Sequence, residues 1–260
     1  MWHASAELEG YGQQDAHSFF LAALDQMHAH AKGQLSSCNC IAHQTFSGSL
    51  LSSVTCSACS RPSTTIDPIL DIQLDFPTSE SAGLTLAGLL RRFCAEEKVR
   101  GYECSNASCE GGKGVVARRK LMIKKLPPVL SFQLKRFAHS ATSTKVETSV
   151  KFPSRLDMRP YTDGGTEPGI PSSVYMYDLF AVVTHEGKLD NGHYWADVLS
   201  GDEWWHCDDD KVTPTTLAAV LAQKAYMLFY VKRSLAYAQP QSRLLKDNKP
   251  GGHVIKGMAV

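Results

Sequence analysis

The chain has 260 residues, of which 43% are hydrophobic and 20% are charged, and its formal net charge is +1. A chain of this length buries a sizeable core in one elaborated domain or two small ones, and its composition is that of a soluble globular protein. The near-neutral charge and the lack of an apolar run long enough to cross a bilayer argue against direct binding to nucleic acid or membrane.

The eight cysteines indicate the compartment and the chemistry of the protein. Residues 1–7 lack the basic and apolar regions of a secretory signal peptide, so we expect the cysteines in a reducing compartment. Clustered cysteine and histidine in such a protein hold metal more often than they form disulfides. We therefore expect an intracellular protein that contains zinc.

The first predicted element is a helix over residues 13–31, which contain neither glycine nor proline. Asp15 suits the first turn of this helix, because a carboxylate there meets the positive end of the helix dipole. The apolar residues that recur at helical spacing are Phe20, Leu24, Met27 and Ala31. The pattern predicts an amphipathic helix packed on the core.

Three potential metal ligands follow this helix, namely Cys38, Cys40 and His43. A structural zinc site takes four nitrogen or sulfur ligands in a tetrahedron, so this cluster needs one more. His17 is the natural candidate, because it lies on the preceding helix and a short link through Gly33 would fold the segment back against it. The alternative is a group of buried thiols that holds no metal.

Two further cysteine pairs, Cys56 with Cys59 and Cys104 with Cys109, are separated by an intervening subdomain. Turn residues lie between the two thiols of each pair. A zinc ribbon has this layout, because each pair binds the metal from its own turn. The sequence therefore predicts a second zinc site with four cysteine ligands.

Strands dominate the rest of the chain. Residues 46–76 are expected as strands, and Leu70, Ile72, Leu74 and Phe76 alternate with polar residues. The later strand-like stretches are 113–125, 129–137, 177–185, 194–199 and 225–231. Residues 84–93 predict a short helix, and residues 234–260 lose the pattern and predict a loose tail. A helix followed by strands with hairpin-like links indicates an α+β domain.

Catalytic residue types occur near the end of the chain. His193 stands in a Gly-His-Tyr turn between two strand-like runs, and an acidic cluster follows at Asp208. An imidazole takes a proton from a nucleophile, and a carboxylate holds its tautomer and stabilises the imidazolium. The pair is typical of the general-base half of a hydrolase site, with Asp209 as the alternative orienting carboxylate.

Together these segments resemble the ubiquitin-specific proteases, the papain-like cysteine proteases that remove ubiquitin from proteins. The matching stretches are residues 12–19, the pairs Cys56/Cys59 and Cys104/Cys109, and residues 134–137, 177–185, 192–194 and 205–209. The resemblance implies a thumb–palm–fingers architecture in a partial catalytic domain over residues 1–233, with fingers at roughly 46–120 and palm at roughly 121–233. It also implies hydrolysis of the isopeptide bond at the ubiquitin C-terminus, with His193 as base.

Within the family, the chain is similar to the histone deubiquitinase branch of the SAGA transcriptional coactivator. The similarity lies in residues 38–43 with His17, which are similar to an extra zinc site of that branch, and in residues 137–140 and 152–158. It implies ubiquitinated histone H2B as substrate, coactivator subunits as partners and a nuclear location.

One feature of the family has no counterpart in the sequence. The segment that carries the nucleophilic cysteine and the oxyanion-hole asparagine should lie upstream of Gln13, and the chain begins after it. Cys94 lies within a helix-like run and Cys207 is next to Asp208, so neither has the setting of a reactive thiolate. We therefore expect part of the thumb to be missing and the chain to be inactive. The alternatives are a non-catalytic ubiquitin-binding module and a zinc-stabilised scaffold.

Overall fold

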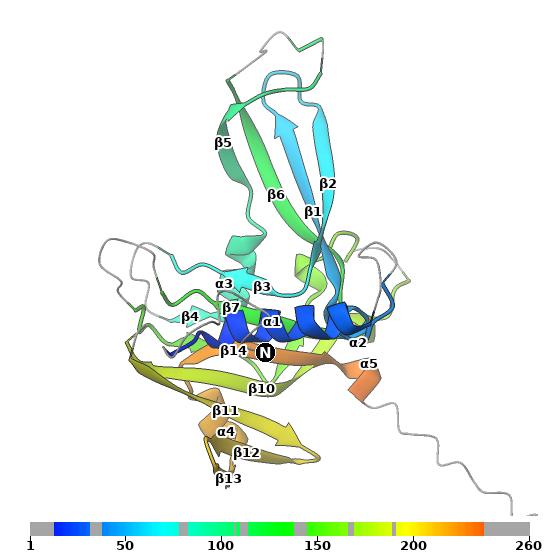
Figure 1. Cartoon of the computed structure of the whole chain (residues 1–260). Coiled ribbons are helices and arrows are strands. Elements are labelled where there is room, and N and C mark those ends of the chain that lie inside the picture. The colour runs from blue at the N-terminus through cyan, green and yellow to red at the C-terminus, as the bar shows by residue number, and fades with distance from the viewer. Residues whose placement is uncertain are drawn as a thin grey trace, which may run out of the picture.

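The computed structural model describes residues 13–31, 38–77, 83–106, 108–109, 114–137, 145–165, 169–188 and 191–236. Two sheets and a set of short helices account for most of this part of the chain (Figure 1). None of the described helices is long and apolar enough to span a membrane. The expected tail falls largely on residues 237–260, which lie outside the described residues.

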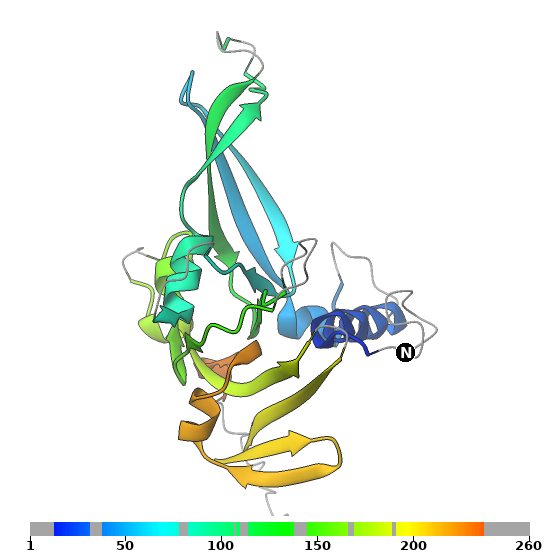
Figure 2. The same cartoon turned by 90° about the vertical axis from the view of Figure 1, so that its left-hand side faces the viewer.

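A four-stranded antiparallel sheet forms a long arm. Its strand order is β2 (Pro62–Ile69), β1 (Gly48–Cys56), β6 (Val115–Lys125) and β5 (Glu97–Tyr102). Figures 1 and 2 show this arm projecting from the rest of the molecule. Most of its side chains are half-buried or exposed, because both faces of an arm of this kind meet solvent. We call this sheet the fingers.

An eight-stranded sheet forms the body. Its path runs through β13 (Lys211–Thr215), β12 (Glu203–Asp208), β11 (Gly192–Ser200), β10 (Met176–Gly187), β14 (Ala225–Lys232), β7 (Val129–Leu134) and β3 (Ile72–Leu74), and β9 (Arg155–Asp157) pairs with β10. All neighbours are antiparallel except β3 and β7. We call this sheet the palm. A separate parallel pair joins β4 (Leu84–Thr85) to β8 (Val150–Lys151).

The main core lies against the palm. Phe132 of β7 is fully buried and meets the ring of Tyr230 of β14 edge-to-face, with 5.9 Å between ring centroids. β7 is buried along nearly its whole length, as expected for a central strand covered on both faces. The core therefore stiffens the strands β10 and β14, which lie between β7 and the strand that carries His193.

The helix α3 (Leu86–Phe93) covers this core as its sequence predicts. Thr85 caps the helix by accepting a hydrogen bond from the N–H of Gly88 at 3.0 Å. Leu86, Leu89 and Leu90 are buried on the inward face. The remaining helices are α1 (Ala16–His30), α2 (Ile41–Phe46), α4 (Leu217–Leu221) and α5 (Arg233–Ala236), with 3-10 turns at Arg159–Tyr161 and Ser172–Tyr175.

The helix α1 confirms the helix expected over residues 13–31, but its buried face differs from the predicted one. Leu24 is buried and Phe20 packs beside it, whereas Met27 is 41% exposed. The inward face therefore runs through Leu24 to His28, one helical turn further on, rather than to Met27. Figures 1 and 2 show α1 and α2 beside the base of the fingers.

Candidate active site and metal clusters

The Gly-His-Tyr turn lies where the hairpin of β10 and β11 closes. Gly187 pairs with Gly192, and Glu186 pairs with His193. A Cβ atom added at Gly192 would lie 1.9 Å from Nε2 of the buried His185, so only glycine fits this close approach. Packing thus requires glycine at position 192. The next residue, His193, lies at the end of the palm sheet beside the β10–β11 turn.

His193 and Asp208 form the pair that the sequence predicts. Nε2 of His193 lies 2.5 Å from Oδ1 of Asp208, which stands at the end of the neighbouring strand β12. A carboxylate only accepts hydrogen bonds, so Nε2 carries the proton in this contact. Nδ1 is then the imidazole nitrogen that does not face Asp208. Asp209 lies in the same cluster but in a left-handed turn at φ +51°, and among the described residues the imidazole has its hydrogen bond with Asp208 and not with Asp209. Asp208 is therefore the carboxylate that contacts the imidazole.

The electrostatics follow from this contact. The hydrogen bond to Asp208 raises the pKa of His193 above its ordinary value, and the charges of Asp209 and Glu186 act in the same direction. The hydrogen bond from His193 lowers the pKa of Asp208. The ion pair is complete in the pH window between the lowered carboxyl value and the raised imidazole value. The stabilisation by this ion pair is lost as pH falls through the lowered pKa of Asp208, or as pH rises through the raised pKa of His193.

The start of α1 is fastened to this hairpin. Oε1 of Gln13 accepts a hydrogen bond from the N–H of Gly192 at 2.7 Å. Asp15 caps α1 by accepting from the N–H of Ser18 at 2.8 Å, and its other oxygen accepts from the hydroxyls of Tyr194 at 3.1 Å and Tyr226 at 2.5 Å. One carboxylate thus joins α1 to β11 and β14, next to His193.

A groove runs between α1 and the palm, with a volume of about 800 Å³. Its walls include Asp15 and Leu21 on the α1 side, and Asp75, Gln133 and Phe137 on the palm side. We call it the α1 groove. Because Asp15 contacts the tyrosine that follows His193, one part of the α1 groove lies close to His193.

A buried arginine supports the floor of the α1 groove. Arg136 is 1% exposed, and burial lowers the pKa of its guanidinium to about 10. It donates hydrogen bonds to the backbone carbonyls of Ala225 at 2.7 Å, Val146 at 2.9 Å and Thr148 at 2.9 Å. The Leu-Lys-Arg-Phe stretch therefore has a structural role, because its arginine ties the loop after β7 to β14.

All eight cysteines fall among the described residues, and none of them lies beside His193. Six belong to two clusters described below. Cys94 lies at the end of α3, where burial raises the pKa of its thiol to about 11 despite the opposing charge of Lys120. Cys207 precedes Asp208 on β12, so its side chain points to the opposite face of the strand.

The four-cysteine cluster forms as the sequence predicts, at the tip of the fingers. The sulfurs of Cys56 and Cys109 are 3.8 Å apart, and those of Cys59 and Cys104 are 3.7 Å apart. Zinc–sulfur bonds of about 2.3 Å in a tetrahedron place sulfurs about 3.8 Å apart. The donors therefore have the identity and the spacing of a zinc site.

The second cluster contains His28 where we expected His17. Nδ1 of His28 lies 3.2 Å from the sulfur of Cys38, and Nδ1 of His43 lies 3.0 Å from the sulfur of Cys40. All four donor atoms lie within 4.8 Å of one another. His17 is eleven residues earlier on the same helix, about 16 Å away along its axis, and cannot reach them.

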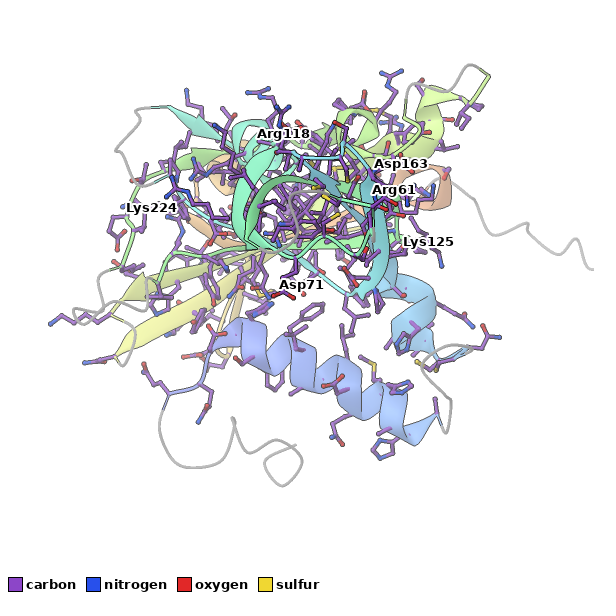
Figure 3. All side chains as sticks on the ribbon, turned by 90° about the horizontal axis from the view of Figure 1, so that it is seen from above. Arg61, Asp71, Arg118, Lys125, Asp163 and Lys224 are labelled. Atoms are coloured by element: carbon purple, nitrogen blue, oxygen red, sulfur yellow. The ribbon has the colours of Figure 1, made fainter. Side chains whose placement is uncertain are left out.

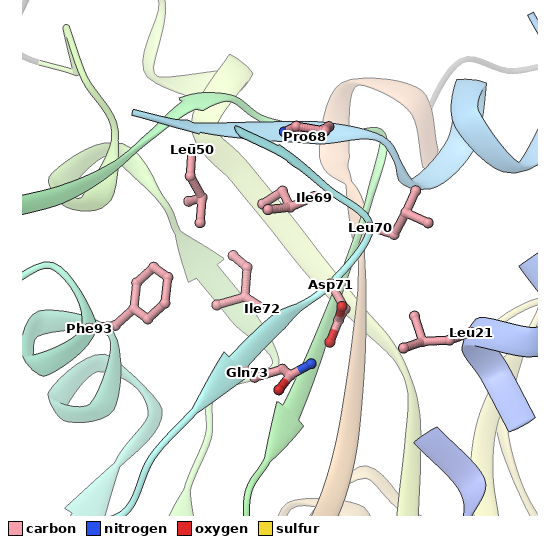
Figure 4. Close-up of a pocket in the computed structure, with 9 residues that line it drawn as sticks. All are labelled: Leu21, Leu50, Pro68, Ile69, Leu70, Asp71, Ile72, Gln73 and Phe93. Atoms are coloured by element: carbon pink, nitrogen blue, oxygen red, sulfur yellow. The ribbon is translucent and has the colours of Figure 1, made fainter. Parts of the chain in front are cut away.

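His17 has a different partner. Its Nε2 lies 2.7 Å from Oδ2 of Asp71, just before β3, and both side chains are largely buried. Figure 3 shows Asp71 as the labelled residue nearest to α1. Figure 4 shows Asp71 between Ile72 and Leu21 in a cavity of about 390 Å³ at the base of the fingers. The contact of His17 with Asp71 joins the start of α1 to the palm. Neither His193 nor Asp208 lines this cavity.

Sequence reasoning missed His28, Gln13 and Asp15 as contributors to these sites. His28 follows the buried Leu24 by one helical turn, which was the available signal that it faces inward. Asp15 stands directly before α1 as a capping residue, but its contact with Tyr194 joins residues far apart in the sequence. No local pattern indicates such a contact.

Comparison with known proteins identifies the relatives of the chain. A family model described as ubiquitin carboxyl-terminal hydrolase matches residues 1–230. The chain is 38% identical to ubiquitin carboxyl-terminal hydrolase 22 of Bos taurus over 91% of this chain and 54% of that protein. It is 40% identical to probable ubiquitin carboxyl-terminal hydrolase 8 of Schizosaccharomyces pombe over 92% of this chain and 49% of that protein. The chain thus spans about half the length of these relatives.

Solved structures agree with this relationship. The SAGA Ubp8/Sgf11/Sus1/Sgf73 DUB module bound to ubiquitin aldehyde aligns with a TM-score of 0.75 and 34% sequence identity. The alignment covers 89% of this chain and 52% of that chain. The expected α+β, papain-like fold of a ubiquitin-specific protease is confirmed, and the chain belongs to the ubiquitin carboxyl-terminal hydrolase family.

Proposed function

We propose that the chain is the base-carrying part of a cysteine-type deubiquitinase that hydrolyses the isopeptide bond at the ubiquitin C-terminus. The observation that carries the proposal is the contact of His193 with Asp208. The next residue, Tyr194, donates a hydrogen bond to Asp15 in the wall of the α1 groove. The partial catalytic domain comprises residues 1–233, with the fingers region at roughly 46–120 and the palm region at roughly 121–233. Within the fingers region, β3 belongs to the palm sheet.

The chemistry follows from the two nitrogens of His193. Asp208 accepts the hydrogen bond from Nε2–H, so Nδ1 is free to take the proton of a thiol. The thiolate attacks the carbonyl carbon of the isopeptide bond, and the imidazolium then gives its proton to the leaving amine. Water hydrolyses the thioester, with His193 again as the base. The thiol is not one of the eight cysteines of this chain, because none of them lies beside His193.

The α1 groove suits an extended polypeptide such as the ubiquitin tail. It has a volume of about 800 Å³, it carries the carboxylates Asp15 and Asp75, and Asp15 accepts a hydrogen bond from Tyr194, the residue after His193. Figure 2 shows the fingers projecting from the body with α1 beside their base, and there they would hold the globular part of ubiquitin. The similar SAGA module was solved with ubiquitin aldehyde bound, which supports this proposal.

The same similarity supports proposals about the setting of the protein. We propose that zinc occupies both metal clusters, with His28 as the fourth ligand of the second. We also propose ubiquitinated histone H2B as substrate, coactivator subunits as partners and a nuclear location, on the resemblance of the chain to the SAGA branch. The solved SAGA DUB module contains Sgf11, Sus1 and Sgf73 beside Ubp8, which supports the proposal of partner subunits. In both clusters the metal would cross-link strands or helices, which is a structural role.

A non-catalytic ubiquitin-binding module is the second candidate. It is favoured by the position of the eight cysteines, all of which lie away from His193. The full transcript discriminates between the two. A reading frame that encodes a cysteine segment upstream of Met1 supports the enzyme, and a frame without one supports the binding module.

We predict that the purified 260-residue chain does not hydrolyse a fluorogenic ubiquitin conjugate, because no thiol lies within reach of Nδ1 of His193. The measurement is the release of the fluorophore over time, with a complete cysteine deubiquitinase as positive control. Turnover by this chain, abolished by the His193→Ala substitution, would contradict the assignment of the nucleophile to another segment.

A further inference from the structure

The fingers sheet has two faces, and the register of its strands assigns each side chain to one of them. Leu121, Arg119 and Glu97 line a cavity of about 750 Å³ together with residues of α3 and the palm. We call the face with these three side chains the inner face. Side chains alternate along a strand, so the positions between them point to the opposite side of the sheet, which we call the outer face.

Positive charge gathers on the outer face. Arg118 and Lys120 of β6 lie there, because they alternate along the strand with the inner side chains. Lys98 of β5 pairs directly with Arg118 and so shares its face. All three side chains are exposed. The outer face therefore presents three neighbouring cations to solvent.

The acidic side chains of the four strands lie on the inner face. They are Glu97 of β5 and Asp67 of β2. Glu97 forms an ion pair with Arg119. Leu50 of β1 pairs with Asp67 on one side and with Ile123, an inner-face residue of β6, on the other. Charge on the inner face is thus balanced within the sheet.

Charge on the outer face is only partly balanced. Glu96, directly before β5, lies 3.6 Å from Arg118, and both side chains are more than half exposed. Among the residues that the structure describes, Lys98 and Lys120 form no ion pair. The outer face therefore keeps a net positive charge, which attracts an anionic partner.

Exposed apolar side chains flank these cations. Ile66 of β2 is 61% exposed and Val116 of β6 is 43% exposed, and within the described part of the fingers they are the large hydrophobic residues open to solvent. Ile66 pairs with Leu51 of β1, which pairs with Met122 on the outer face of β6. Val116 lies about 20 Å from Met122 along β6, and the cations lie between the two ends.

We propose that the outer face of the fingers is a docking surface for an extended acidic segment of a partner protein, whose carboxylates meet the three cations and whose apolar residues cover Ile66 and Val116. A segment of about six residues spans this distance. Lysine and arginine pair with carboxylates. A nucleic-acid backbone offers phosphates for the cations but no apolar group for the two hydrophobic side chains, so the surface favours a polypeptide.

The test is the fluorescence anisotropy of a labelled synthetic peptide, about six glutamates with a leucine at each end, titrated with the zinc-loaded chain. We expect saturable binding that weakens as salt is added, because salt screens exposed charges. The double variant Arg118→Gln with Lys120→Gln is expected to weaken binding about tenfold. Ile66→Ser, which removes one apolar anchor, is expected to weaken it about threefold.

The matched control is Arg92→Gln with Arg119→Gln, which removes the same amount of charge from the lining of the inner cavity. This control is expected to leave the affinity for the peptide unchanged. All the substituted side chains are exposed, so the variants are expected to fold as the parent chain does, and thermal unfolding verifies this.

Three results would overturn the proposal. The first is no binding of the peptide by the parent chain, and the second is equal weakening by both double variants. The third is duplex DNA that displaces the labelled peptide at a lower concentration than the unlabelled peptide does, because the surface would then recognise phosphate. The measurement contains no ubiquitin, so its outcome is independent of the proposed function.

Discussion

Removal of zinc is expected to abolish the cooperative unfolding transition of the chain. The four cysteines of the fingers come from separate turns, and the second cluster joins α1 to α2. A structural zinc contributes about 10 kcal/mol in small zinc domains, comparable to the whole stability of many domains. Calorimetry before and after chelation, with metal analysis, is the measurement. A chain that still melts cooperatively with no zinc present would contradict the structural role.

Paired histidine substitutions test the ligands of the second cluster. His28→Ala is expected to remove one zinc and His17→Ala none, because only His28 lies with the cysteines. His17→Ala is a stringent control for His28→Ala, because both residues lie on α1 and His17 is the more deeply buried of the two. Loss of zinc in His17→Ala with full zinc in His28→Ala would restore the ligand set that we first expected from the sequence.

The Phe132→Ala substitution is expected to destabilise the chain by about 3–5 kcal/mol, because it removes a fully buried ring and leaves a cavity. The ring contacts Tyr230 across β7 and β14, so the cavity opens in the centre of the palm. The melting temperature should fall by roughly 10 °C for a domain of this size. Thermal unfolding of the zinc-loaded chain measures the effect.

The same substitution at Phe19 provides the control for Phe132→Ala. Phe19 lies on α1 and is 50% exposed, so Phe19→Ala is expected to change stability by no more than about 0.5 kcal/mol. Equal destabilisation by both substitutions would show that the outer face of α1 is buried in solution, contrary to the structure.

Much of the candidate site was predictable because its chemistry is local in the sequence. The Gly-His-Tyr turn and Asp208 lie on adjacent strands of one meander, so a short stretch of sequence contains both partners. The two cysteine pairs of the fingers have turn residues between their thiols, which is a local signal of a metal ligand pair. The alternation around Ile72 and Leu74 similarly predicted a strand.

The contributions that the sequence did not predict depend on contacts made only in the folded chain. The helix pattern of α1 fits two faces that differ by a small rotation. The inward face contains the buried Leu24 and the partly buried His28, whereas Met27 is exposed. The shared face of Lys98 and Arg118 requires the register of β5 and β6 to be known.

The binding of ubiquitin to the chain, measured by titration calorimetry, tests the account most directly. We predict one ubiquitin bound per zinc-loaded chain, and weaker binding of ubiquitin that lacks its C-terminal tail, because the tail is the part that would enter the α1 groove. Equal affinity for both forms would contradict the role of the groove. The absence of any binding by the zinc-loaded chain would contradict the proposed function as a whole.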